Sequence, residues 1–319
     1  MNNKYKEKVA LLLKTYGQDT LSYFHLQDDR QYFFSPSGKS FLSFRVLNKV
    51  AIVAADPVGE CSEFSHLISS FLEYLRAWKI KPCFIGLSSS HLSTFHANGF
   101  KTTKIGEEAI INLLTFSNTN LKKKVRRAVR HIDEMCIEIF FYTPRNIPSF
   151  INQQIVQISQ SWIKNNGRKE RGFSMTLKRL PTDFDADCIY AVAMEKSKVI
   201  GYLCFAPIYK SSALSLDQAR RRVDSPNGLN EFLIIKSAEY FKANGIKRIS
   251  LNFAIFSNIL KDKSDLLSTL STILERLYKS HTLRAFNEKF SPSWETRYAA
   301  FASLRHMPIY LLAILRAER

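Results

Sequence analysis

The chain has 319 residues, of which 45% are hydrophobic and 13% aromatic. This composition is typical of a well-packed globular protein and excludes a disordered one, and the length is enough for roughly two domains. The formal net charge of +18 is extreme for an enzyme of small metabolites. It predicts a polyanionic partner, such as a nucleic acid or an anionic membrane surface.

Several features of the sequence indicate the cellular compartment of the protein. The five cysteines are odd in number and form no C-x-x-C pair, which favours free thiols in a reducing compartment. The chain opens on an amphipathic stretch with charges throughout, not on a signal peptide, and the apolar run at 307–315 is too short to span a bilayer. The spacing of His91 and His96 is wrong for two metal ligands on one helix face. We expect a cytoplasmic protein without a metal site, able to bind the inner face of a membrane peripherally.

Hydrophobic periodicity and turn signals divide the chain into two similar halves. The first half is expected to contain, in chain order, a helix at 4–16, hairpin strands over 31–60 with turns at 37–38 and 48–49, a helix at 62–79, a strand at 81–88, a short helix at 91–100 and an extended segment at 105–116. The second half is expected to contain a helix at 148–165, a hairpin of strands at 188–196 and 198–208, a helix at 229–244 and a strand at 247–253.

Helix, antiparallel hairpin, helix, strand is the order of the N-acetyltransferase-like (GNAT) α/β fold. We therefore predict an α/β chain with tandem GNAT-like domains at 1–120 and 136–319, the second one catalytic, and a basic connecting helix at 121–135. In this helix Val125, Ala128 and Val129 form an apolar stripe. Its cations, which predict binding of tRNA or another polyanion, are Lys122, Lys123, Lys124, Arg126, Arg127 and Arg130. A solvated charged helix is the alternative.

Two clusters of charged residues lie late in the chain. The stretch SALSLDQARRRVDSPNGLNEFL at 212–233 places an acid and three arginines at an expected strand end, before a Pro-Asn-Gly turn that opens a helix. The first N–H groups of such a helix can hold an anion. The alternative is a solvated helix end closed by an i,i+3 pair of Asp217 and Arg220. The stretch RAFNEKFSPSWETRY at 284–298 is the second cluster, and we expect the two to form one site.

GNAT enzymes that use acyl-CoA hold its pyrophosphate on a glycine-rich loop, because only glycine lets the backbone N–H groups close on phosphates. The corresponding segments here, RRRVDSPNGLNEF and DPVGE, contain one glycine each. The sequence thus predicts an acyl transferase with a donor other than acyl-CoA.

The segments AADPVGE, IGEEAIINL, LKKKVRRAVRHIDE, KERGFSM, SLDQARRRVDSPNG and FNEKFSPSWETRY occur in this order along the chain. Together they resemble the C-terminal cytosolic domain of the phosphatidylglycerol lysyltransferases, the multiple peptide resistance factor proteins or aminoacyl-phosphatidylglycerol synthases. The resemblance runs from about Leu21 to Leu315. The family's transmembrane flippase region has no counterpart in the sequence.

The resemblance implies transfer of a lysyl, alanyl or arginyl group from aminoacyl-tRNA to a hydroxyl of a membrane lipid, usually phosphatidylglycerol. An aminoacyl ester is already activated, so no cofactor is required. The attacking hydroxyl needs a carboxylate, for which Asp217 is the first candidate and Glu288 the second. Arg220 and Lys289 are candidates for contacts to the lipid phosphate or the oxyanion.

The remaining candidates bind substrate. Arg221 and Arg222 are expected at the tRNA end, Asn227 and Gly228 in the turn, and the cleft wall is expected to include Trp294, Arg297 and Tyr298. Two alternatives stay open. The acceptor could be a sterol, a peptide or a small molecule, or the chain could be a non-catalytic module that binds tRNA or membranes.

Overall fold

The computed structural model describes residues 3–165, 176–177, 179–255 and 280–317. In the first half, the elements in chain order are α1 (Asn3–Tyr16), β1 (Gln31–Phe34), β2 (Ser40–Leu47), β3 (Val50–Ala54), β4 (Val58–Gly59), α2 (Phe64–Ala77), β5 (Lys81–Leu87), α3 (Leu92–Ala97) and β6 (Lys101–Asn112). The connecting helix is α4 (Lys123–Glu134). Most of these bounds agree closely with those expected from the sequence, but β6 begins and ends four residues earlier than the extended segment expected at 105–116.

The second half contains β7 (Glu138–Tyr142), α5 (Ser149–Asn165), β8 (Ile189–Glu195), β9 (Lys198–Ile208), β10 (Ala213–Arg221), α6 (Leu229–Ala243) and β11 (Arg248–Ile255). The chain ends with α8 (Ser280–Asn287), the short 3-10 turn η6 (Glu288–Phe290), β12 (Ser293–Phe301) and α9 (Met307–Ala317). The KERGFSM segment at 169–175 lies outside the described residues.

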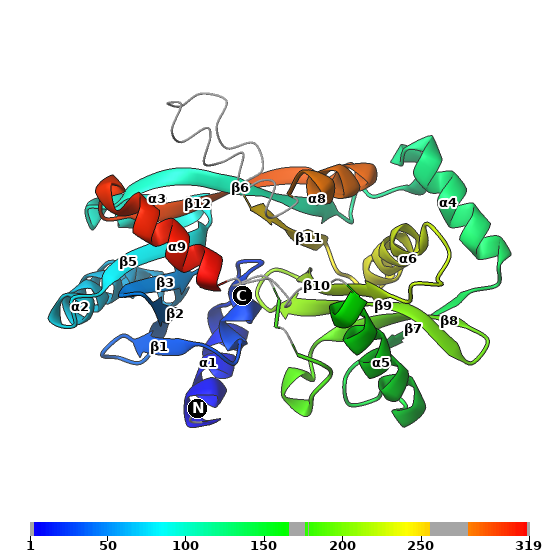
Figure 1. Cartoon of the computed structure of the whole chain (residues 1–319), viewed down its shortest axis with the longest axis horizontal. Helices are drawn as coiled ribbons and strands as arrows, with labels where there is room; N and C mark the ends of the chain where they lie inside the picture. Colours follow the sequence, from blue (N-terminus) through cyan, green and yellow to red (C-terminus); the bar gives the residue numbers. More distant parts are fainter. Residues whose placement is uncertain (1–2, 166–175, 178, 256–279, 318–319) are drawn as a thin grey trace.

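Within the described residues, twelve strands form one mixed sheet that runs through both halves (Figure 1). The strand order is β1-β2-β3-β5-β12-β6-β11-β10-β9-β8-β7, and β4 pairs with β2. The strand β12 near the C-terminus lies between β5 and β6 and is antiparallel to both. A strand from near the C-terminus is therefore inserted between two strands of the first half.

Each half contains one parallel pair of strands, joined by a helix that crosses over. In the first half β3 and β5 are parallel and α2 connects them; in the second half β10 and β11 are parallel and α6 connects them. In open α/β sheets, ligands bind at the carboxyl ends of such strands. The fold therefore offers two crevices, one at the ends of β3 and β5 and one at the ends of β10 and β11.

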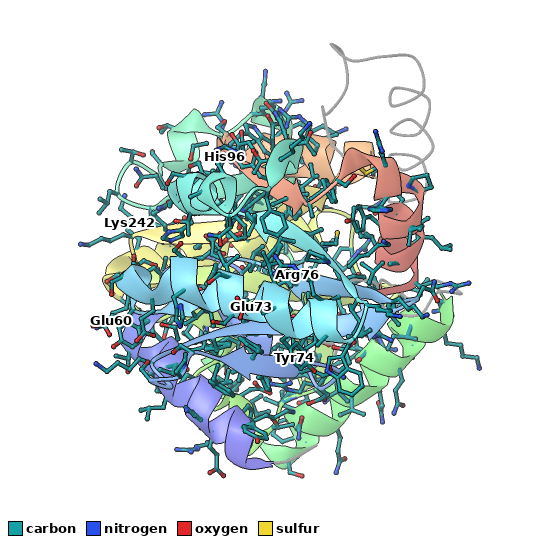
Figure 2. The ribbon with its side chains drawn as sticks, turned by 90° about the vertical axis from the view of Figure 1, so that its left-hand side faces the viewer. Glu60, Glu73, Tyr74, Arg76, His96 and Lys242 are labelled. Atoms are coloured by element: carbon teal, nitrogen blue, oxygen red, sulfur yellow. The ribbon has the colours of Figure 1, made fainter. Side chains whose placement is uncertain are left out.

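Helices cover both faces of the sheet. In the first half α2 and α3 pack on one face, while α9 packs on the other (Figures 1 and 2). In the second half α4 and α6 share one core, and α5 shares a second core with α1. Helix α1 also contacts β4, so its core includes residues from both halves.

Two turns show how local sequence shapes this fold. Asn48 and Lys49 both have positive φ angles, of 50° and 59°, between β2 and β3. Two successive residues with positive φ are typical of a type I′ turn, whose twist matches that of the two strands of a hairpin. Gly228 has a φ of 94° at the start of α6, and a Cβ there would come within 2.9 Å of the Ala128 Cβ. Glycine at 228 therefore lets α4 pack directly against the beginning of α6.

Candidate functional site

A cation-rich pocket lies at the carboxyl end of β10, beside the first turn of α6. It has a volume of about 600 Å³, and its lining comes from α4, the end of β10, the start of α6 and the α8–η6 segment. The charged and polar side chains of the lining are Lys122, Lys124, Arg221, Asn227, Asn230, Glu231 and Lys289. The structure thus joins parts of both charged clusters and of the basic helix. We call it the cationic pocket.

Three interactions set the charge of this pocket. The Lys289 ammonium lies 2.7 Å from the Glu231 carboxylate, in the first turn of α6. Arg221 donates to the hydroxyl of Ser225 at 2.9 Å, which holds its guanidinium beside the loop. Since no side chain caps α6, the positive end of its dipole adds to the field. The positive charge from lysine and arginine therefore exceeds the single carboxylate of Glu231.

Asp217 and Arg220 do not lie at a strand end, where the sequence predicts them. Both are buried within β10, which continues to Arg221, so the expected strand end before the arginines is wrong. The solvated helix end with an i,i+3 pair is wrong too, because these residues are in a strand. The strand extends this far because β9 is long and pairs with it as far as Arg221.

Burial of these charges is possible because each has hydrogen-bond partners. The Asp217 carboxylate accepts the N–H of Leu177 at 2.9 Å. Arg220 donates to the hydroxyl of Ser159, and its guanidinium lies 5.3 Å from the ring centre of Trp162, both on α5. Asp217 therefore lies inside the protein, between the sheet and the residues that follow α5.

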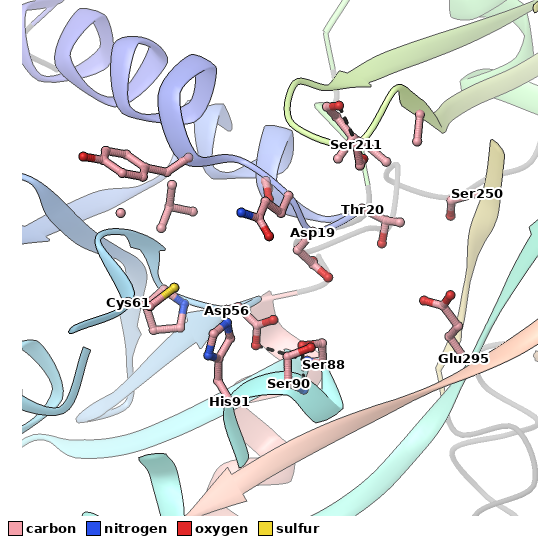
Figure 3. A pocket seen from close by; sticks show the side chains of 18 of the residues that line it. Asp19, Thr20, Asp56, Cys61, Ser88, Ser90, His91, Ser211, Ser250 and Glu295 are labelled. Atoms are coloured by element: carbon pink, nitrogen blue, oxygen red, sulfur yellow. Dashed lines mark hydrogen bonds between the residues drawn. The ribbon is translucent and has the colours of Figure 1, made fainter. Parts of the chain in front are cut away.

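A second pocket lies at the carboxyl ends of β3 and β5, where the first half meets the second (Figure 3). Its volume is about 320 Å³. Figure 3 shows Asp19, Asp56 and Glu295 reaching into the same space from three different segments. The polar lining also includes Gln18, His91 and Arg248, and the hydroxyl groups of Thr20, Ser22, Ser88, Ser90, Ser211 and Ser250. We call it the acidic pocket.

The carboxylates of the acidic pocket differ in their partners. Asp56 is buried, and one of its oxygens accepts the N–H of Ser88 at 3.1 Å. Glu295 forms an ion pair with Arg248 at the wall of the pocket. Asp19 accepts from Arg297 at 2.6 Å. Burial raises the pKa of Asp19 to about 6, with Arg297 lowering it and the neighbouring carboxylates Asp56 and Glu108 raising it.

A buried network lies behind this pocket. Arg297, in β12, donates to Glu108 of β6 at 2.8 Å and to the Gly86 carbonyl at 3.2 Å, in addition to Asp19. Glu108 also accepts from the hydroxyl of Ser250 in β11. One guanidinium thus faces two carboxylates, and Asp56 adds a third nearby. The pocket has an excess of negative charge, which suits a cationic ligand.

The other predicted site residues are spread over the structure. Glu288 is exposed in η6, and Arg222 pairs with Asp224 at 3.1 Å just after β10. The Arg284 guanidinium lies 4.0 Å from the ring centre of Trp294. Trp294 also packs against the core that contains α6. Tyr298 packs against the core under α2 and α3. The α4 cations are exposed, while Val125 and Ile132 hold the helix against the core.

Sequence reasoning missed most of the acidic pocket. The segments DPVGE, IGEEAIINL and RAFNEKFSPSWETRY contain Asp56, Glu108 and Glu295, but none of these residues was assigned to a shared acidic pocket. Asp19 follows a helix and Arg248 lies at the start of a strand, and no local pattern marks either of them. Among the described residues, no group of three histidine, cysteine or acidic side chains could hold a metal ion. In the same part of the chain, no helix combines the length and apolar character needed to cross a bilayer.

Residues 10–301 match the family model "Phosphatidylglycerol lysyltransferase, C-terminal". The chain belongs to this family. Among curated proteins it is similar to the lysylphosphatidylglycerol biosynthesis bifunctional protein LysX of Nocardia farcinica, with 29% identity over 94% of this chain and 27% of that protein. The LysX protein of Mycolicibacterium vanbaalenii is 30% identical over 96% of this chain and 28% of that protein. This chain therefore spans little more than a quarter of the length of these relatives.

Solved structures confirm the fold predicted from the sequence. The L-PGS structure from Bacillus licheniformis has a TM-score of 0.86 and 24% identity, and it covers 98% of this chain and 96% of that one. The C-terminal domain of a putative lysylphosphatidylglycerol synthetase from Agrobacterium fabrum has a TM-score of 0.86 and 23% identity, with 99% and 97% covered. The GNAT-like α/β architecture and the family resemblance are confirmed.

Proposed function

We propose that this chain transfers an aminoacyl group from aminoacyl-tRNA to a hydroxyl of phosphatidylglycerol. Family membership supports a role in lysylphosphatidylglycerol synthesis. The observation that carries the proposal is the pair of pockets of opposite charge, one near each end of β10. The tRNA donor joins a cationic amino acid to a polyanion, and the acceptor lipid is anionic.

The length of β10 suits the end of a charged tRNA. Ala213 at the start of this strand lines the acidic pocket, and Arg221 at its end lines the cationic pocket. Eight residue steps separate them, or roughly 26 Å at about 3.3 Å per residue. In our proposal the ammonium groups of the amino acid lie in the acidic pocket, and the terminal phosphates of the tRNA lie by the cationic pocket. Asp217 lies half-way along the strand, between the two pockets, and lines neither of them.

The reaction exchanges one ester for another. The lipid hydroxyl oxygen attacks the ester carbonyl carbon and forms a new C–O bond. The bond to the tRNA ribose oxygen breaks, and this oxygen receives a proton. A carboxylate can accept the proton of the attacking hydroxyl, and cations can stabilise the oxyanion. We assign the carboxylate role to Asp217, with Glu288 as second candidate, and oxyanion or phosphate contacts to Arg220 and Lys289.

The cations outside the reaction centre bind RNA in this proposal. The exposed side chains of α4 continue the positive charge of the cationic pocket, since Lys124 belongs to both and Lys122 directly precedes the helix. Arg221 and Arg222 complete this path at the end of β10. Phosphate contacts of this kind do not depend on the base sequence and weaken with salt.

Lysine is the amino acid that the acidic pocket favours. A lysyl ester carries two ammonium groups, and the pocket offers Asp19 and Asp56 on separate segments. Alanine would occupy only one of them. The names of the relatives, which refer to lysylphosphatidylglycerol, point the same way.

The test is a transfer assay with radiolabelled lysyl-tRNA and phosphatidylglycerol vesicles, followed by organic extraction. We expect label in the lipid phase, its loss after RNase treatment of the donor, and no acetyl transfer from acetyl-CoA. Alanyl- and arginyl-tRNA serve as matched donors. Label that appears only on a soluble amine or a sterol would replace the proposed acceptor, and acetyl-CoA turnover would refute the proposed donor.

A further inference from the structure

A surface at the α2–α9 end of the molecule combines exposed apolar side chains with cations. Trp78, which follows α2, is 67% exposed, and Ile309 and Leu312 on α9 are exposed as well. Lys79, Arg305 and Arg316 are exposed on the same two segments. Single exposed apolar residues are ordinary on a protein surface, but this end gathers an exposed tryptophan and two aliphatic residues.

The segments that carry these residues lie together. The Lys81 ammonium at the start of β5 lies 3.3 Å from the His306 ring, just before α9. Arg316 near the end of α9 donates to the Asn48 side chain at 2.5 Å, and the Lys81 N–H donates to the Lys49 carbonyl at 2.8 Å. Figure 2 shows the last turn of α2, at Arg76, on the side of the molecule that α9 occupies. Trp78 and α9 therefore belong to one end of the protein.

The charge of this end is mainly positive. The sequence contains no aspartate or glutamate in 31–55, in 74–106 or in 296–317. The acids nearby are Glu73 on α2, which is exposed, and Asp29, which pairs with Arg45 beside the end of α9. Such an excess of cations is complementary to an anionic partner. The basic helix α4 is also positive, but its exposed residues are all polar, with five lysines and arginines beside His131, Asp133 and Glu134, and such cations suit contacts to RNA phosphates. Unlike α4, the α2–α9 end adds exposed tryptophan, isoleucine and leucine to its cations.

We infer that the α2–α9 surface docks on an anionic lipid bilayer. Amphipathic tryptophan at the level of the headgroups, aliphatic residues pointing into the interface and flanking cations are the features of a peripheral membrane anchor. The surface residues take no part in the proposed chemistry. The inference concerns how the protein reaches a bilayer, and it can be tested without measuring transfer.

The test is flotation of the full chain with vesicles of phosphatidylcholine alone or with 30% phosphatidylglycerol, at low and high salt. We expect binding only to the anionic vesicles, weakened by salt. Lys79→Ala with Arg305→Ala should lower the partition coefficient about fivefold for each cation removed. Trp78→Ala with Leu312→Ser should lower it by roughly tenfold.

The matched control is Leu114→Ser. Leu114 is 65% exposed, and it follows β6 close to Phe116, whose carbonyl contacts Lys242 of α6 in the second half. This variant should float like the wild type, and all variants should melt near the wild-type temperature because the changed side chains are exposed. On monomeric short-chain phosphatidylglycerol, the surface variants should retain wild-type transfer, which separates a docking defect from a catalytic one.

Two results would overturn the inference. One is wild-type flotation of both double variants. The other is unchanged flotation together with loss of tRNA binding, which would make the α2–α9 surface an RNA contact.

Discussion

Lys289→Ala is the most informative single change in the cationic pocket. The Lys289 ammonium is held 2.7 Å from Glu231 at the start of α6 and lies 4.9 Å from the ring centre of Phe286. Its side chain is 35% exposed, and that of Glu231 is 15% exposed. The ammonium can therefore reach an anionic substrate from a position that the protein already holds.

The structure predicts different magnitudes for stability and for activity. A half-exposed ion pair contributes about 0–1 kcal/mol to the free energy of unfolding, so the melting temperature should fall by no more than a few degrees. A hydrogen bond from a charged group to a bound phosphate or oxyanion contributes about 1.5–3 kcal/mol. This corresponds to a fall in kcat/KM of roughly ten- to 150-fold.

The assay is transfer from lysyl-tRNA with the lipid concentration varied. A higher KM for the lipid with unchanged kcat would assign Lys289 to the lipid phosphate, and a lower kcat would assign it to the oxyanion. The control is Lys236→Ala, because Lys236 on α6 forms a similar half-exposed ion pair with Asp133 at 3.0 Å and lines neither pocket. Equal activity of the two variants, or wild-type activity of Lys289→Ala, would refute the role of Lys289.

Three further predictions follow from the site. Replacing Lys123, Arg126 and Arg130 with alanine should lower the log–log salt slope of tRNA binding by about 0.7–0.9 for each phosphate that the variant no longer neutralises, and an unchanged slope would mean that these cations serve solubility. Because burial raises the pKa of Asp19 to about 6, its carboxylate becomes ionised as the pH rises through 6. If that carboxylate binds an ammonium, kcat/KM for lysyl-tRNA should rise with pH up to about 6 and then level off, whereas a flat profile between pH 5 and 7.5 would exclude this role. Asp217→Asn should slow transfer by about 10²–10⁴, and because the buried carboxylate accepts the Leu177 N–H, the change should also lower the melting temperature by a few degrees; full activity of this variant would shift the carboxylate role to Glu288, and unfolding would make Asp217 structural.

Elements that depend on neighbouring residues could be predicted from the sequence. The apolar spacing of Phe64, Leu67, Phe71 and Leu75 predicts α2, and all four side chains are buried. The basic helix with its packed Val125 was predicted in the same way. Such patterns are readable because a helix brings together residues only three or four positions apart. The family motifs are equally local, and they indicated the fold before any contact was known.

The pockets depend on contacts between distant residues. Arg297 meets Asp19, 278 residues away, and Glu108, 189 residues away. It does so because β12 enters the sheet between β5 and β6, and no local pattern specifies a partner strand so far along the chain. For the same reason the burial of Asp217 and Arg220 could not be read from their sequence, since Leu177, Ser159 and Trp162 provide it.

The sequence by itself thus determined most of the helices and strands, the family and the positive charge, but not the strands β7 and β12. Only the tertiary structure decided which charges meet. It placed Lys289 beside Glu231 and Arg221, and it assembled an acidic pocket from segments around Asp19 and Asp56. The physical reason is that hydrophobic periodicity records which face of an element is buried, whereas the position of a charge in a pocket depends on how strands pair across the whole sheet.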